Sequence, residues 1–266
     1  MTDFHVFKAG NHGGFAIFVR RITTADIVDA LRRGFGDFWE IPSHQIFVVV
    51  VYPVIGFVLF AWVSEANAWH LIYPLVAGFA LFGPIAALGL YEISRRRELG
   101  LNNTPQHILQ VIHSPAIPSI AALGLWLLAL FIGWVYAAHS IYSWLFADAA
   151  FESPVAFLAA VIGTAQGWKL LLLGNLVGLG FGVVVLATTV VAFPLLLDRD
   201  VGLSMAVAVS VFALLKNPAP VLSWGVIVVG LLLLGALPAL VGLVIVLPVL
   251  GHSTWHVYRK IVRIHD

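Results

Sequence analysis

The chain has 266 residues, of which 61% are hydrophobic and 10% charged, and its formal net charge at pH 7 is +1. A soluble domain usually carries about 25% charged residues, so this composition, with a mean hydropathy of +1.00, indicates an integral membrane protein. The near-neutral charge argues against nucleic-acid binding. The absence of cysteine excludes disulfides, thiolate metal sites and cysteine nucleophiles.

The elements predicted in chain order begin with a polar segment. Residues 1–43 are predicted to be cytoplasmic and to contain an amphipathic helix with one apolar face, formed by Ile27, Leu31, Phe35 and Phe38. Residues 44–258 are predicted to form a single all-α membrane domain, and residues 259–266 a cytoplasmic tail. A spanning helix needs about 20 mainly apolar residues. Six spans are predicted, at residues 45–64, 71–91, 117–146, 170–197, 219–234 and 238–257.

The last two spans share one long apolar stretch, Ala219 to Val257. A straight helix of that length would be about twice as long as the hydrocarbon layer is thick, so we expect a turn at Gly235-Ala236-Leu237-Pro238. Each arm is short, and a re-entrant hairpin is the alternative. Two further apolar segments, 154–163 and 201–215, are predicted to be interfacial helices on the outer and inner sides.

The distribution of basic residues predicts the orientation. With the N-terminus inside, all of the 14 lysines and arginines except Lys169 lie on the cytoplasmic side. Because cytoplasmic loops are enriched in these residues, we expect both termini in the cytoplasm.

A weak internal repeat suggests how the six spans are organised. Pro84, Pro194 and Pro248 each precede a polar cytoplasmic exit, and each predicted hairpin follows a short segment that ends in proline (residues 26–42, 105–115 and 201–218). This pattern predicts three parallel-oriented hairpins, each preceded by a cytoplasmic amphipathic helix, around an axis along the membrane normal. The alternative is chance similarity, because proline is common near membrane surfaces.

Four strings in the chain carry a family resemblance. Residues 74–84 (PLVAGFALFGP) and 89–96 (GLYEISRR) resemble DUF2189, a family of uncharacterised bacterial integral membrane proteins. Residues 193–199 (FPLLLDR) and 251–259 (GHSTWHVYR) are similar to the rest of that pattern, so the resemblance covers roughly residues 25 to 262. It implies the inner membrane of a Gram-negative bacterium and supplies no activity. A label that relates some members to cytochrome oxidase subunit I suggests a respiratory oxidase as a neighbour.

Two histidines are the candidate cofactor ligands. His252 and His256 are spaced i, i+4, so both project from one face of a helix. This spacing suits two metal ligands or a haem site, and a quinone site is a further reading. Three other histidines on the same side of the membrane could approach them: His44, His107 and His113. The competing interpretation, which implies no cofactor, is that both histidines bond to lipid headgroups or a neighbouring helix.

Other polar and small residues form two candidate groups. The first is a polar cluster at the cytoplasmic exits, which suits either local salt bridges or a docking site for a headgroup or partner: Glu92, Arg95, Arg96, Asp198, Arg199 and Arg259. The second group is a glycine stripe at Gly174, Gly178 and Gly182, with Asn175 beside it. The stripe permits close packing of an internal helix or of another subunit, and Asn175 is expected to bond across a helix interface.

No catalytic motif stands out, and the spans contain almost no ionisable residues. We therefore expect a non-enzymatic accessory or assembly subunit of a larger membrane complex, with the bilayer and other membrane subunits as partners. The alternatives are a haem-, metal- or quinone-binding protein that uses His252 and His256, and a transporter of a small neutral or lipidic solute.

Overall fold

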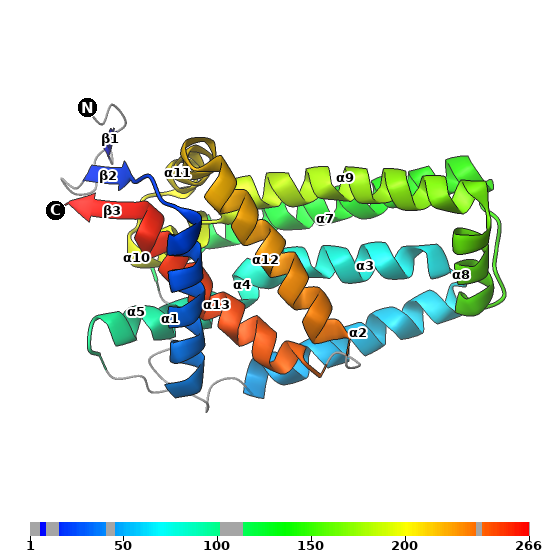
Figure 1. The fold of residues 1–266 in the computed structure, drawn as a ribbon, viewed down its shortest axis with the longest axis horizontal. Coiled ribbons are helices and arrows are strands. Elements are labelled where there is room, and N and C mark those ends of the chain that lie inside the picture. Colours follow the sequence, from blue (N-terminus) through cyan, green and yellow to red (C-terminus); the bar gives the residue numbers. More distant parts are fainter. Residues whose placement is uncertain (1–5, 9–15, 41–45, 102–113, 238–240, 266) are drawn as a thin grey trace. The chain divides into compact units, whose positions relative to one another are not determined.

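The structure is a computed structural model that describes residues 6–8, 16–40, 46–101, 114–237 and 241–265. The described chain is mainly helical, as predicted, and divides into two compact units. Unit 1 contains Met1–Val49, Gly83–Gly124 and Leu186–Asp266, and unit 2 contains Val50–Phe82 and Leu125–Val185. Figure 1 shows the helices and strands of both units.

Among the described residues, four helical stretches are long and apolar enough to cross a membrane: Trp69–Glu98, Ile117–Phe146, Ala165–Asp198 and Pro218–Ala236. The second is helix α7 and the fourth is α12. They correspond to four of the predicted spans. The other two predicted spans correspond to α2 (Ile46–Glu65) and α13 (Leu243–Ile261), and Pro238 of the predicted turn lies outside the described residues.

Prolines divide the long stretches into shorter helices. Trp69–Glu98 consists of η2 (Trp69–Leu71), α3 (Ile72–Phe79), η3 (Ala80–Phe82), α4 (Gly83–Ala86) and α5 (Leu88–Glu98). Ala165–Asp198 consists of α9 (Ala165–Thr189) and α10 (Ala192–Asp198). Proline lacks the amide donor and its ring displaces the carbonyl four residues earlier, so the ladder is interrupted near Pro84 and Pro194. Pro248, by contrast, lies inside α13.

The two predicted interfacial helices are present. One is α8 (Pro154–Gly163), with the Ser153 Oγ accepting a hydrogen bond from the Ala156 amide at 3.2 Å. The other is α11 (Leu203–Lys216). The similar segment predicted at residues 105–115 falls largely on residues that are not described.

The sequence analysis did not predict strands. Among the described residues, β1 (Val6–Lys8), β2 (Ala16–Val19) and β3 (Val262–His265) form an antiparallel sheet in the order β1-β2-β3. Ile17 pairs with Ile264, and the Arg20 amide donates to the Ile261 carbonyl at 2.7 Å. The N- and C-terminal segments therefore lie side by side (Figure 1).

The packing of unit 1 centres on α1 (Thr24–Glu40) and α13, which run against each other. The buried face of α1 contains Ile27, Ala30, Gly34, Asp37 and Phe38. Phe35, predicted on this face, is exposed instead, because Gly34 and Asp37 occupy the positions that face α13 and α5.

Unit 2 contains α3, α8 and most of α7 and α9. The Trp134 indole of α7 donates to the Pro74 carbonyl of α3 at 2.8 Å. Trp134 also contacts Phe181 of α9, with ring centroids 6.0 Å apart. Aromatic packing and a few hydrogen bonds therefore hold these apolar helices together.

Candidate functional site

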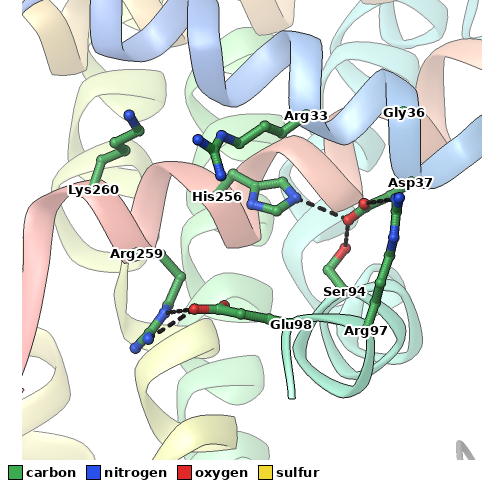
Figure 2. A pocket seen from close by; sticks show the side chains of 9 residues that line it. All are labelled: Arg33, Gly36, Asp37, Ser94, Arg97, Glu98, His256, Arg259 and Lys260. Carbon is green, nitrogen blue, oxygen red and sulfur yellow. Dashed lines mark hydrogen bonds and ion pairs between the residues drawn. The ribbon is translucent and has the colours of Figure 1, made fainter. Parts of the chain in front are cut away.

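A cavity of about 460 Å³ lies in unit 1 where α1, α5 and α13 meet. Its volume is within the range of about 300–1,000 Å³ that is typical of small-molecule sites. Figure 2 shows the lining side chains: Arg33, Gly36, Asp37, Ser94, Arg97, Glu98, His256, Arg259 and Lys260.

Asp37 is the most highly connected residue of the lining. It is 3% exposed, and its Oδ2 accepts hydrogen bonds from Ser94 Oγ at 2.5 Å and from His256 Nε2 at 2.9 Å. Its Oδ1 pairs with Arg97, which also reaches Glu40 at 2.5 Å. Burial alone would raise the pKa of Asp37, but the hydrogen bonds from His256 and Ser94 hold it below its ordinary value. Asp37 is therefore a carboxylate whose oxygens are both occupied.

Ser94 links Asp37 to His252. The Ser94 hydroxyl donates to Asp37, so the contact of 2.8 Å between Ser94 Oγ and His252 Nδ1 assigns the proton to that ring nitrogen. In a catalytic triad the histidine stands between the serine and the carboxylate. Here the buried serine stands between them and donates to the carboxylate directly, so the arrangement differs from that of a catalytic triad.

Both oxygens of Glu98 are also hydrogen-bonded. Its Oε2 accepts from Trp255 Nε1 at 3.0 Å, and its Oε1 accepts from Arg259 Nε at 2.9 Å. Arg259 also lies 3.6 Å from Asp198 of α10, which accepts a hydrogen bond from Tyr258 at 2.7 Å. These contacts join the ends of α5, α10 and α13.

The cationic side of the cavity retains free donors. Lys260 Nζ lies 2.8 Å from Asp29, and Arg33 uses its Nε for the same carboxylate at 2.9 Å. Within the described residues, the two terminal nitrogens of Arg33 form no hydrogen bond or ion pair. The cavity therefore offers hydrogen-bond donors and positive charge, while both lining carboxylates are already occupied. A ligand that fits this lining must bring acceptors or negative charge.

The predicted polar cluster is only partly brought together. Glu92 is 5% exposed and pairs within α5 with Arg95 at 2.9 Å and Arg96 at 3.2 Å, away from the cavity lining. Asp198 and Arg259 approach each other, and Arg259 lines the cavity. Arg199 follows the last residue of α10 and does not line the cavity.

The two candidate histidine ligands lie on one face of α13 but bond to different partners, Ser94 for His252 and Asp37 for His256. Among the described residues, no group of three or more histidine and carboxylate side chains is arranged as metal ligands. His44, His107 and His113 lie outside the described residues. The haem, metal or quinone reading stays a prediction.

The glycine stripe belongs to unit 2. A Cβ atom on Gly178 would lie 2.8 Å from the Trp134 ring, so this glycine allows α7 and α9 to pack closely. A Cβ atom on Gly174 or on Gly182 would meet no described atom within 4 Å. Asn175 accepts a hydrogen bond from Tyr73 at 2.8 Å and donates to the Leu171 carbonyl at 2.8 Å.

Sequence reasoning missed most of the cavity lining, above all Asp37, Ser94 and Arg33. One signal was available for Asp37. Asp37 follows Ile27, Ala30 and Gly34 at helical spacing, on the face of α1 that becomes buried. A carboxylate on such a face requires a partner, and Ser94 and Arg97 supply it from a distant part of the chain.

The long apolar helices define a helical, multi-pass integral membrane protein. Residues 72–198 match the sequence model of DUF2189, described as a predicted integral membrane protein, so this segment of the chain is similar to that family. The match includes Ser94, Arg97 and Glu98 but neither α1 nor α13, so it is narrower than the resemblance over residues 25 to 262. No curated protein and no solved structure matches the chain.

Proposed function

We propose that the chain crosses the membrane six times, as three hairpins that each return to the same side. Contacts within unit 1 support this arrangement. The β2–β3 pairing joins the two termini, and Asp37 of α1 binds Ser94 and Arg97 at the end of the first hairpin. Asp198, at the end of the second hairpin, binds Tyr258.

The junction between α11 and α12 also contacts the N-terminal segment. Asn217 accepts from the Ile22 amide at 2.8 Å and donates to the Arg20 carbonyl at 2.9 Å. Segments joined by such bonds must lie on one side of a bilayer, so crossings between them come in pairs. The stretch Trp69–Glu98 then needs α2 as its partner, and α12 needs the first part of α13. The arginine-rich composition of these segments favours the bacterial cytoplasm as the shared side.

We propose that the biochemical role is binding: unit 1 receives a negatively charged group in its cavity, and the protein acts as an accessory membrane protein. One observation carries this proposal. Both lining carboxylates already bind protein donors through each of their oxygens, whereas the terminal nitrogens of Arg33 have no partner among the described residues. The position of Ser94 between His252 and Asp37 favours binding over nucleophilic catalysis. Association with other membrane subunits stays the prediction from sequence.

The proposal is tested by isothermal titration calorimetry. The purified full chain in maltoside micelles is titrated with inorganic phosphate. Arg33→Gln removes the two terminal guanidinium nitrogens, and Arg32→Gln is the matched control, because Arg32 is an exposed neighbour outside the lining. We expect saturable binding that Arg33→Gln weakens and Arg32→Gln preserves. Absence of saturable binding, or equal loss in both variants, rejects the proposal.

A further inference from the structure

We infer that the group received by the cavity is the phosphate of an anionic membrane phospholipid, held where α1 lies along the bilayer surface. This inference rests on the proposed binding role of the cavity. Three apolar side chains of α1 carry it: Val28, Phe35 and Trp39, which are 61%, 51% and 73% exposed. Their spacing places them on one face of the helix, and the Phe35 and Trp39 rings stack with centroids 5.9 Å apart. We call these three residues the exposed stripe.

The bilayer surface is the occupant that suits the exposed stripe. Helix α1 ends at Glu40, and the apolar helix α2 begins at Ile46, so the end of α1 that carries Trp39 closely precedes the proposed first span in the chain. Tryptophan and phenylalanine prefer the headgroup region, and basic residues on such a helix attract anionic lipids. Arg33 is an exposed basic residue of the same helix, and it lines the cavity.

The cavity and the exposed stripe occupy neighbouring faces of α1. Gly36, which lines the cavity, lies about 60° from Trp39 around the helix, and the other two lining residues of α1, Arg33 and Asp37, lie further from the stripe. A phospholipid beside the helix can therefore place its phosphate in the cavity while its acyl chains lie against the stripe. The terminal nitrogens of Arg33, which project into the cavity in Figure 2, match two phosphate oxygens.

The charge of the lining selects among phospholipids. Of the lining residues, four are arginine or lysine and two are carboxylates, so the formal charge of the lining is positive. Arg33, Arg259 and Lys260 offer positive charge. The cavity therefore favours phosphatidylglycerol or phosphatidic acid over phosphatidylcholine, because the bound headgroup then carries net negative charge.

The test measures lipid binding to the full chain in maltoside micelles by native mass spectrometry, with phosphatidylglycerol and phosphatidylcholine as probes. We expect selective retention of phosphatidylglycerol, weakened by roughly tenfold or more in Arg33→Gln and preserved in Arg32→Gln. Gly36→Leu provides a second variant, because a Cβ there meets no described atom within 4 Å and the larger side chain fills the cavity without removing a contact. It should also abolish selective retention.

Binding of inorganic phosphate and of phosphatidylglycerol to the Trp39→Gln variant separates the lipid inference from the proposed binding role. Trp39→Gln should weaken phosphatidylglycerol binding and leave inorganic phosphate binding unchanged. If phosphate binds through Arg33 but phosphatidylglycerol gains nothing over phosphatidylcholine, the lipid inference is overturned and the anion-binding role stands. If neither probe depends on Arg33 or Gly36, both are overturned. Equal lipid loss in the Arg32 and Arg33 variants indicates diffuse surface attraction and also overturns the lipid inference.

Discussion

Gly34 of α1 and Ser253 of α13 meet so closely that a Cβ atom on Gly34 would lie 2.1 Å from the Ser253 Oγ and 2.4 Å from its amide nitrogen. The two helices thus cross backbone to backbone. Any side chain at residue 34 must push α1 away from α13, which would separate Asp37 from His256 and open the cavity.

We therefore expect Gly34→Ala to destabilise unit 1 by about 1–3 kcal/mol or more, since the backbone of α13 must move. Gly36→Ala is the matched control on the same helix, where the added methyl group meets no described atom within 4 Å. Its better helix propensity should stabilise α1 by up to about 1 kcal/mol. Thermal unfolding followed by tryptophan fluorescence distinguishes them, and equal stability of the two variants would show that the helices do not meet at Gly34.

Asp37→Asn tests the buried network. The substitution removes the charge that compensates Arg97 and bonds His256, so we expect a loss of about 3 kcal/mol, as for other buried pairs that lose one partner. Asp29→Asn on the same helix removes an exposed partner of Lys260 and should cost little. Comparison of unfolding temperatures gives the result, and similar losses in both variants would contradict a central role for Asp37.

The pH dependence of stability provides a separate prediction. The pKa of Asp37 is held below its ordinary value of 3.8, so its ionised form stabilises the folded state. This contribution is complete above the unfolded pKa and is lost as the pH falls through the lower folded value. Wild-type stability should therefore fall more steeply than that of Asp37→Asn below about pH 4, with parallel profiles above about pH 5. If the stabilities of the wild type and of Asp37→Asn fall in parallel below about pH 4, the Asp37 contacts do not form.

The membrane helices were predictable from sequence because hydrophobic length is a local signal. The segment 117–146 was predicted with the same bounds that α7 has, and the interfacial helix 154–163 coincides with α8. The strands were not predictable, since β2 and β3 are short and pair across almost the whole chain. The end of α13 was also underestimated, because Val257 is followed by Tyr258, Arg259 and Lys260, which are polar in sequence yet remain helical.

The candidate site shows the same division between local and long-range information. Sequence reasoning singled out His256 and Arg259, which lie on one helix, and both line the cavity. It did not connect Asp37 with Ser94, because their contact joins helices that are distant in the chain. It also grouped Glu92 with Asp198, whereas Glu92 is satisfied within its own helix by Arg95 and Arg96.

Single-cysteine labelling tests the proposed three-hairpin topology most directly, because the native chain contains no cysteine. Three variants place a thiol at exposed positions predicted to face outside, namely Ala66→Cys, Ala150→Cys and Leu237→Cys, and three place one at exposed positions predicted to face the cytoplasm, namely Leu99→Cys, Asp200→Cys and Arg263→Cys. In right-side-out vesicles, a membrane-impermeant maleimide should label the first three variants only. In inverted vesicles it should label the last three only. Labelling of Leu237→Cys from the cytoplasmic side, or of Leu99→Cys from the outside, would contradict three hairpins that return to one cytoplasmic unit.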